Sequence, residues 1–336
     1  MKVLHILFSN RFGGAEKVAM DIISHGQNSI ESLYCCYEGD ITEILKEKNL
    51  NFIHLKNITS TSIAKIVKEH NITIIHAHDF RASIIASSLH KKVKVISHIH
   101  QSPHWLNNIF SLKFISYKMI SHRFSKILLT SIDIKNTKLF ANIKQTLVLP
   151  NFVKKDDTID IPQRKVYDFI FVGRFESIKR PRKFIQIIKE IQDENPSVTA
   201  LMVGTGSLFE EIRNEIKEKK INIKLVGFVN DPQVYIAKSS FLINTSISEG
   251  FGIASVEAMQ LGVPVITYKN GGVSDEIATG SNGIIITEEA KLAKKLNGYL
   301  TSNHKYKKLS ENSKKLGSKY NNYSEWIKII QSVYED

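Results

Sequence analysis

Apolar, β-branched runs alternate with amphipathic helical stretches along most of the chain, and this alternation restricts the fold more than any other feature. The runs KVLHILF and ITIIHAH are followed by the helical stretches GGAEKVAMDIISHG and RASIIASSLH. The same pattern restarts further on with YDFIFVGRF, VTALMVGTG and FLINTS. Because strands that alternate with helices form mostly parallel sheets, the sequence predicts an α/β fold.

The alternation is interrupted by the polar segment KKDDTIDIPQRK at residues 154–165. A chain of 336 residues exceeds one ordinary core, so we expect two domains of roughly 150 residues each. We place the first at residues 1–155, completed by a C-terminal helix at about 320–336, and the second at 156–319. Open parallel sheets bind ligands at the carboxyl ends of their strands, so functional residues are sought there.

The net charge of +13 is compatible with nucleic acid, a membrane surface or anionic small molecules as partners, and equally with a lysine-rich solubilising surface. Residues 1–150 hold 19 Lys and Arg against 10 Asp and Glu. The positive excess therefore lies mainly in the first half of the chain.

Cysteine content and apolar runs bear on localisation. Cys35 and Cys36 are adjacent and form neither an ordinary disulfide framework nor a four-ligand zinc site by themselves. No apolar run reaches the roughly 18 residues that a membrane span needs, and VLHILF is too short for a signal peptide. We expect a cytoplasmic protein.

Two histidine pairs end predicted neighbouring strands: His76 and His78 in IIHAHDF, and His98 and His100 in ISHIHQSP. We take the two members of each pair to point to opposite faces, so that each pair turns one imidazole toward a given site. On this basis we expect no metal. His100, just past a strand end, is our candidate for hydrogen bonding a polar ligand, and a structural histidine is the alternative.

Glycines and cations also follow predicted strands. Gly13 and Gly14 in RFGGAE begin a helix whose free N–H groups could receive an anion, and a plain turn is the alternative. The G-x-G-x-x-G spacing of dinucleotide-binding proteins is absent. Arg174 and Lys179 in FIFVGRFESIKR would suit a diphosphate, and a solvated charged loop is the alternative.

The stretch SEGFGIASVEAMQLGVPVI predicts a glycine turn, a short helix over IASVEAMQL and a buried strand. Free N–H groups after Gly252 would receive phosphate oxygens, while Glu249 and Glu257 would accept hydrogen bonds from sugar hydroxyls. Phosphates and hydroxyls together indicate a nucleotide sugar. The alternative is a helix cap with Glu257 in solvent.

In these motifs the chain resembles the retaining glycosyltransferases of family 4, within glycosyl transferases group 1. Those enzymes have the GT-B fold, two Rossmann-like domains with parallel sheets facing across a cleft. The most specific motif is the pair Glu249 and Glu257, which has seven residues between its two members and begins in EGFG. The others, in the family's order, are GGAEKVA, HAHD, SHIHQSP, LPNFV, VGRFESIKR, VGTGSLFEEI, LVGFV and GGVSDEI.

The resemblance implies an acceptor-binding first domain and a donor-binding second domain. It implies that Arg174 and Lys179 neutralise the departing diphosphate and that Glu257 holds the ribose diol. Arg180 stands where the family usually has glycine, and either adds charge or tightens the turn. The implied catalytic residues are His100, Arg174, Lys179 and Glu249, and the implied donor-binding residues are Gly13, Gly14, Gly173, Gly204, Phe228, Val229, Gly250, Phe251, Gly252, Ile253 and Glu257.

The implied reaction moves a hexose-type sugar from a nucleotide diphosphate sugar, with UDP favoured, to a glycan or lipid-linked glycan. It needs no cofactor or metal and belongs to bacterial cell-surface polysaccharide synthesis. One alternative is a sugar-nucleotide epimerase of the same fold. Another is a basic nucleic-acid-binding protein, although zinc-finger, RRM and basic-zipper signatures are absent, so we expect no nucleic-acid partner.

Residues 104–127, HWLNNIFSLKFISYKMISHRFSKI, mix aromatic and basic side chains. A buried helix would explain the aromatic spacing. No Asp or Glu occurs between Asp79 and Asp133, however, and basic residues bind anionic bilayers while apolar ones insert. We therefore expect peripheral binding to an anionic membrane surface through Trp105, Phe110, Phe114, Tyr117 and Phe124 together with Lys113, Lys118, Arg123 and Lys126.

Overall fold

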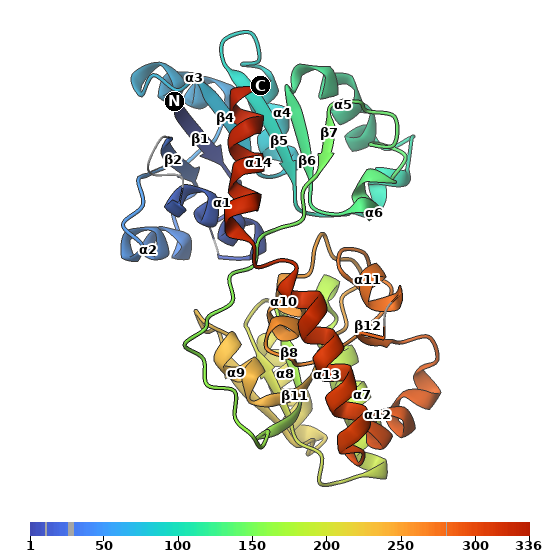
Figure 1. The fold of residues 1–336 in the computed structure, drawn as a ribbon. Coiled ribbons are helices and arrows are strands. Elements are labelled where there is room, and N and C mark those ends of the chain that lie inside the picture. Colours follow the sequence, from blue (N-terminus) through green and yellow to red (C-terminus); the bar gives the residue numbers. More distant parts are fainter. Residues whose placement is uncertain (11, 26–29, 280) are drawn as a thin grey trace. The chain divides into compact units, whose positions relative to one another are not determined.

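The computed structural model describes residues 1–10, 12–25, 30–279 and 281–336. These form two compact units (Figure 1). Unit 1 comprises Met1–Phe152 and Asn322–Asp336, and unit 2 comprises Val153–Asn321. The chain thus passes between the units after residues 152 and 321, whereas the sequence places the boundaries after 155 and 319.

Unit 1 is built on a seven-stranded sheet with the order β3-β2-β1-β4-β5-β6-β7. All of its strand pairs are parallel. The strand order reverses between β1 and β4, which is where open parallel sheets bind ligands. The strands are β1 (Lys2–Ile6), β2 (Glu31–Cys36), β3 (Phe52–His54), β4 (Ile74–Ala77), β5 (Lys94–Ile99), β6 (Lys126–Leu129) and β7 (Thr146–Val148).

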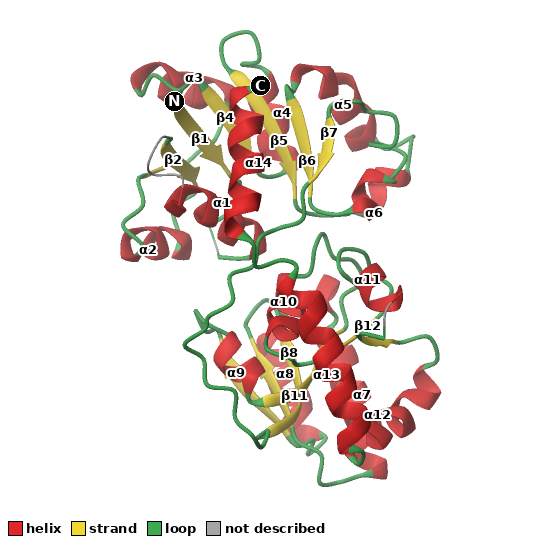
Figure 2. Ribbon diagram, viewed as in Figure 1, coloured by secondary structure: helices red, strands yellow, loops and turns green. Residues whose placement is uncertain are grey.

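The helices of unit 1 connect its strands and cover both faces of the sheet, as Figure 2 shows. Asp79 begins one of them: its side chain accepts a hydrogen bond from the Ala82 N–H at 2.6 Å. The helices are α1 (Gly14–His25), α2 (Asp40–Glu47), α3 (Ser60–Glu69), α4 (Phe80–Ser87), η1 (His104–Asn107), α5 (Leu112–Ile120), η2 (Ser121–Arg123), α6 (Ile132–Lys135) and α14 (Tyr323–Glu335).

Unit 2 has a six-stranded parallel sheet with the order β10-β9-β8-β11-β12-β13. Its strands are β8 (Tyr167–Val172), β9 (Ala200–Val203), β10 (Ile223–Gly227), β11 (Ser239–Asn244), β12 (Val265–Thr267) and β13 (Gly283–Ile285). Its helices are η3 (Ser177–Lys179), α7 (Pro181–Glu194), α8 (Phe209–Glu218), α9 (Gln233–Ala237), α10 (Ile253–Gln260), α11 (Ser274–Thr279), η4 (Glu289–Lys291), α12 (Leu292–Leu300) and α13 (Asn303–Ser318).

Each sheet lies between two apolar layers. In unit 1 one layer contains Leu4, Ile75 and Tyr117. In unit 2, Phe169 and Phe241 belong to one layer, while a second layer packs under α10 and α13. Burial of both sheet faces explains why the strands are almost continuously apolar in the sequence. The predicted α/β fold with two parallel sheets is confirmed.

Among the described residues, no helix combines the length and apolar character that crossing a membrane requires.

Candidate functional site

The predicted donor-binding residues of unit 2 follow the carboxyl ends of adjacent strands. Gly173 and the exposed Arg174 follow β8, Gly204 follows β9, and Phe228 and Val229 follow β10. Phe228 is 52% exposed, which leaves its aromatic ring open to a flat ligand. The strand order places these ends side by side, as expected for a ligand site of a parallel sheet.

Lys179 and Glu249, 70 positions apart in the sequence, form an ion pair. The Lys179 Nζ lies 2.6 Å from Glu249 Oε1, which also accepts hydrogen bonds from Ser246 Oγ at 2.6 Å and Asn244 Nδ2 at 3.3 Å. Burial raises the pKa of Glu249, but the Lys179 charge and the three hydrogen bonds outweigh burial and lower the pKa below its ordinary value. Glu249 is therefore a carboxylate at neutral pH, in contact with the Lys179 side chain.

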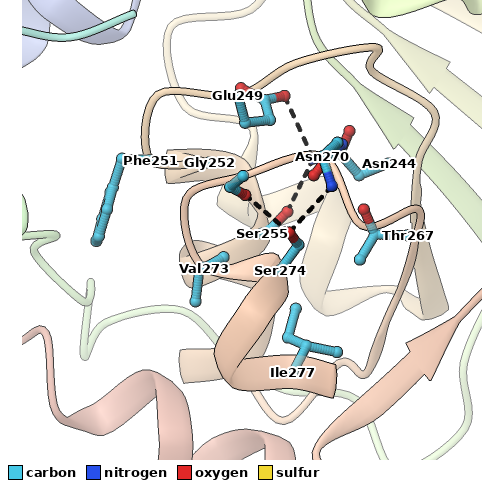
Figure 3. Close-up of a pocket in the computed structure, with 11 residues that line it drawn as sticks. Asn244, Glu249, Phe251, Gly252, Ser255, Thr267, Asn270, Val273, Ser274 and Ile277 are labelled. Atoms are coloured by element: carbon cyan, nitrogen blue, oxygen red, sulfur yellow. Dashed lines mark hydrogen bonds between the residues drawn. The ribbon is translucent and has the colours of Figure 1, made fainter. Parts of the chain in front are cut away.

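The loop that carries Glu249 is tied to its neighbours on two sides. The Glu249 N–H donates to the Asn270 carbonyl at 2.8 Å, and Asn270 Nδ2 donates to the Ser246 carbonyl at 3.0 Å. Thr245 Oγ1 donates to the Lys179 carbonyl at 2.8 Å. These bonds fix both members of the ion pair. Figure 3 shows the small pocket that results, lined by Asn244, Glu249, Phe251, Gly252, Ser255, Thr267, Asn270, Gly271, Val273, Ser274 and Ile277.

The predicted turn, helix and strand around EGFG are confirmed as Gly252, α10 and β12. Gly252 has φ 93°, a left-handed conformation that favours glycine, and no side chain caps the helix that starts at Ile253. The first N–H groups of α10 thus remain available to an anion. Glu257 lies in α10 with 3% exposure, so the alternative of a solvated Glu257 is wrong.

Gly204 serves packing between loops. A Cβ on Gly204 would lie 2.0 Å from the Gly173 carbonyl oxygen, and the residue has φ 132°. Glycine is therefore required here by the close approach of the segments after β8 and β9, whatever binds beside them.

Arg180 occupies a backbone position that favours glycine. Its φ of 48° and ψ of 55° are left-handed, a conformation that costs a non-glycine residue about 1 kcal/mol or more. Two contacts offset this strain: Arg180 Nε donates to the Thr245 carbonyl at 2.6 Å, and the guanidinium lies 4.4 Å from the Tyr268 ring centroid. Two roles were predicted for Arg180, an added charge or a tighter turn, and these contacts within the turn correspond to the second.

In unit 1, Gly13 and Gly14 precede or begin α1, as predicted. Glu16 is buried in the first turn of that helix, and its Oε2 lies where a Cβ on Gly13 would approach within 2.9 Å. A carboxylate thus already occupies the positive end of α1, which electrostatically disfavours a second anion there.

The four histidines do not divide between two faces. The rings of His76 and His78 stack with centroids 4.2 Å apart, and those of His98 and His100 lie 4.0 Å apart. The expectation of opposite faces is wrong, because residues two apart in a strand point to the same face. His5 of β1, paired in register with His76, joins them, so that five imidazoles cluster where β1, β4 and β5 end.

This cluster is also where the described residues could hold a metal. The groups His5, His76, His78 and His78, His98, His100 each have ligand atoms within 4.8 Å of one another. The imidazoles already hydrogen-bond one another, however, at distances of 2.9 to 3.2 Å. The absence of a metal stays a prediction.

Sequence reasoning missed several polar residues. Asn244 and Ser246 lie in NTS directly after the apolar run FLI, and Asn270 lies in NGG. Their position at or just after a predicted strand could have marked them as site residues. His5 gave no such signal, since a single histidine inside an apolar run is an ordinary core residue.

Comparison with known sequences identifies the second unit. Residues 154–316 match the model of the family described as glycosyl transferases group 1. Residues 154–316 belong to this family. The predicted resemblance to glycosyl transferases group 1 is thereby confirmed for these residues.

Curated relatives of this chain include proteins named as glycosyltransferases. A poly(glycerol-phosphate) alpha-glucosyltransferase of Bacillus subtilis is 27% identical over 219 residues, which are 62% of this chain and 32% of the relative. An uncharacterised glycosyltransferase of Methanocaldococcus jannaschii is 30% identical over 227 residues, 66% of this chain and 62% of the relative. The chain thus spans less than two thirds of the length of both relatives.

Solved structures show the same fold. HepE of Anabaena, in complex with UDP and glucose, has a TM-score of 0.84 at 21% identity, covering 100% of both chains. TarM of Staphylococcus aureus, as a mutant in complex with Fondaparinux, alpha-GlcNAc-glycerol and UDP, has a TM-score of 0.77 at 13% identity, covering 100% of both chains. These similarities confirm the predicted GT-B fold, with two Rossmann-like domains.

Proposed function

We propose that this chain is a retaining, metal-independent glycosyltransferase of family 4. It moves a hexose-type sugar from a nucleotide diphosphate sugar to a hydroxyl of a glycan or lipid-linked glycan, in bacterial cell-surface polysaccharide synthesis. The observation that carries the proposal is the ion pair of Lys179 and Glu249 beside the uncapped start of α10, inside the region that matches group 1. UDP-glucose is the first donor to test, since HepE was solved with it.

In this proposal unit 2 binds the donor. The N–H groups at the start of α10 and the Lys179 ammonium receive the diphosphate, and Arg174, exposed after β8, adds a second cation. Glu249 accepts hydrogen bonds from the sugar, and Glu257 accepts them from the ribose. Phe228 and Val229 contact the base.

The chemical step breaks the bond between the sugar and the diphosphate while an acceptor hydroxyl attacks from the same face and gives its proton to the departing diphosphate oxygen. Negative charge develops on the diphosphate, and Lys179 stabilises it more in the transition state than in the ground state, which lowers the barrier. His100, in acceptor-binding unit 1, contacts the transferred sugar. The Lys179 ammonium is already oriented by Glu249, whose carboxylate accepts a hydrogen bond from Ser246 in turn, so little reorganisation accompanies the reaction.

A thermal-shift screen of nucleotide sugars tests donor binding. A donor at one hundred times its Kd adds about 2.7 kcal/mol of stability, or roughly 5 to 10 °C for a unit of this size. Release of nucleotide that depends on added acceptor then separates a transferase from an epimerase. The proposal would be contradicted if no acceptor increased the release of nucleotide, or if no nucleotide sugar raised the melting temperature of the protein.

Membrane binding is proposed through a narrower surface than the sequence predicts. Of the aromatic residues in segment 104–127, Phe114, Tyr117 and Phe124 are buried in the core of unit 1, and Trp105 packs against it. Phe110 is 84% exposed. The exposed apolar side chains are Ile109, Phe110, Leu112, Ile115 and Met119.

These five residues define an exposed apolar ridge on α5 and the turn before it. Leu112, Ile115 and Met119 lie at helical spacing on one side of α5. Lys113 stands exposed within the ridge, while Lys118 donates to the Leu139 carbonyl and Lys126 pairs with Asp336. An apolar ridge beside a cation suits shallow insertion into an anionic bilayer.

Sedimentation with anionic and neutral vesicles tests the ridge. We expect binding to anionic vesicles, weakened by salt, and lost when Phe110 and Leu112 become serine. The double variant Lys118→Gln, Lys126→Gln, whose lysines already have protein partners, is the matched control and should bind like the parent. Equal, negligible binding to both vesicle types would contradict the assignment.

A further inference from the structure

A series of contacts crosses the carboxyl end of the unit 2 sheet, from the turn that carries Lys179 to η4. Arg180 ends that turn, after β8, and its Nε donates to the carbonyl of Thr245, after β11, at 2.6 Å. The Arg180 guanidinium lies 4.4 Å from the ring centroid of Tyr268, after β12. The Tyr268 hydroxyl donates to Glu289, after β13, at 2.5 Å. The series follows the strand order β8-β11-β12-β13.

Arg180 and Thr245 hold each other reciprocally. Arg180 Nε donates to the Thr245 carbonyl, while Thr245 Oγ1 lies 2.8 Å from the Lys179 carbonyl oxygen and 3.0 Å from that of Arg180, so its one proton is shared between them. Thr245 is fully buried. The Ile247 N–H also donates to the Ile178 carbonyl at 2.8 Å. The Lys179 turn is therefore bonded along its length to the loop that carries the other member of the ion pair.

The backbone of Arg180 needs support from its surroundings. Its φ of 48° and ψ of 55° are left-handed, a conformation in which the Cβ crowds the following carbonyl oxygen. A residue other than glycine keeps this conformation only where several contacts impose it. The Tyr268 ring supplies one of them, because a cation is attracted to the electron-rich face of an aromatic ring. Loss of the ring would leave the Arg180 side chain held by Thr245.

The Tyr268 ring is itself held by Glu289. This carboxylate accepts from the Tyr268 hydroxyl and also from Lys183 Nζ at 2.5 Å. The hydrogen bonds from Lys183 and Tyr268 lower the pKa of Glu289 below its ordinary value, whereas burial and the bond to Glu289 raise the pKa of Tyr268. At neutral pH a protonated hydroxyl thus faces an ionised carboxylate, which is a strong, directional hydrogen bond.

We propose that Arg180, Tyr268 and Glu289 are positioning residues for Lys179. Glu289 orients the Tyr268 ring, the ring holds the left-handed Arg180, and Arg180 fixes the Lys179 turn against the loop after β11. All three act through Lys179. Their effect on sugar transfer rests on the proposed function, whereas the coupling between Arg180 and Tyr268 does not.

A double-mutant cycle tests the coupling without any activity measurement. Tyr268→Leu removes the ring that holds Arg180, and Arg180→Gly removes the need for it, because glycine adopts the left-handed conformation without strain. We expect Tyr268→Leu to lower the urea midpoint, followed by far-UV circular dichroism, in the parent chain and to lower it less in the Arg180→Gly background. Equal shifts in the two backgrounds would overturn the proposal.

Tyr306 provides a matched control in unit 2. Its ring centroid lies 5.4 Å from that of Phe241 and its hydroxyl donates to the Ser240 carbonyl at 3.2 Å, so Tyr306→Leu also removes a ring and a hydrogen bond. Ser240 lies near the amino end of β11, the end opposite the Lys179 turn. Tyr306→Leu should lower the urea midpoint equally in both backgrounds. A dependence on background as large as that of Tyr268→Leu would contradict a specific coupling.

Tyr268→Phe tests the link to Glu289, because it keeps the ring and removes the hydroxyl. We expect a smaller fall in the urea midpoint than with Tyr268→Leu, again reduced in the Arg180→Gly background. A fall that is the same in both backgrounds would contradict the orientation of the ring by Glu289. If Tyr268→Leu does not fold, the cycle with Tyr268→Phe decides.

The part concerned with transfer has its own readout. With the donor found in the screen, Tyr268→Leu should lower kcat by about tenfold, and by a larger factor than it changes the donor KM, because a displaced Lys179 ammonium stabilises the transition state less well. Tyr306→Leu should leave kcat unchanged. A normal kcat for Tyr268→Leu would overturn the positioning role in transfer and leave the coupling in stability intact. Absence of turnover in the parent chain would instead count against the proposed function.

Discussion

The Lys179 ammonium should contribute both to the stability of unit 2 and to the rate of the proposed reaction. Its removal should therefore lower both. Glu249 is 12% exposed and Lys179 24%, so this pair lies between the surface pairs worth about 0 to 1 kcal/mol and the buried pairs whose disruption costs about 3 to 5 kcal/mol. Ser246 and Asn244 would still donate to the carboxylate. We expect Lys179→Ala to lower the free energy of unfolding by about 2 kcal/mol at pH 7.

The pH dependence of this loss has a defined sign. Glu249 has a folded-state pKa below its ordinary value of 4.5, so its stabilising effect is present above about pH 4.5 and disappears as pH falls through the folded-state pKa. Lys179→Ala removes the main charge that lowers this pKa. The difference between parent and variant should therefore be largest near neutral pH and shrink below pH 4.5.

Urea unfolding followed by two probes measures the effect in the correct unit. The two tryptophans, Trp105 and Trp326, both lie in unit 1, so their fluorescence reports unit 1, while far-UV circular dichroism also reports unit 2. We expect Lys179→Ala to move the dichroism transition to lower urea and leave the fluorescence transition in place. Lys183→Ala is the matched control, because Lys183 pairs with Glu289, which is 43% exposed, and its loss should cost less than 1 kcal/mol.

In turnover, Lys179→Ala should reduce kcat by about 10²- to 10³-fold, the usual effect of removing one group that stabilises developing charge. Near-normal kcat would refute the leaving-group role. A loss of stability that is equal at pH 3.5 and pH 7 would refute the electrostatic account of the ion pair.

Glu257→Ala should raise the donor KM by the equivalent of about 1 to 3 kcal/mol, and an unchanged donor KM would remove Glu257 from the ribose site. Arg180→Gly should leave the free energy of unfolding within about 1 kcal/mol of the parent, because relief of the left-handed strain offsets the lost contacts. Arg180→Ala loses the same contacts without that relief and should be less stable in urea. Equal stability of the two variants would contradict this reasoning. Turnover should survive EDTA, whereas loss with chelator and recovery with manganese would show a required metal.

Local sequence patterns determined the elements and the positions of much of the candidate site. Alternating apolar and helical stretches predict two parallel sheets, since a strand buried on both faces must be apolar along its length. Gly252 before IASVEAMQL predicts the turn and the start of α10, which depend on backbone preferences within a few residues. The placement of Arg174 and Lys179 after β8 follows from the same local logic.

Tertiary structure alone decided how these side chains are used. The ion pair of Lys179 with Glu249 and the left-handed Arg180 with its contacts to Thr245 depend on how β8 and β11 pair. In segment 104–127, helical spacing does not say which side of α5 faces the core, and packing buries Phe114 while exposing Leu112.

The histidines show the division most clearly. A two-residue spacing already places His76 with His78 on one face of a strand, and correct use of strand geometry would have predicted that much. Their junction with His5 and His100 depends on the order β1-β4-β5 and its register. Sequence determines a residue's neighbours along one strand, whereas contact between strands depends on long-range pairing, which is selected by burial of the whole sheet.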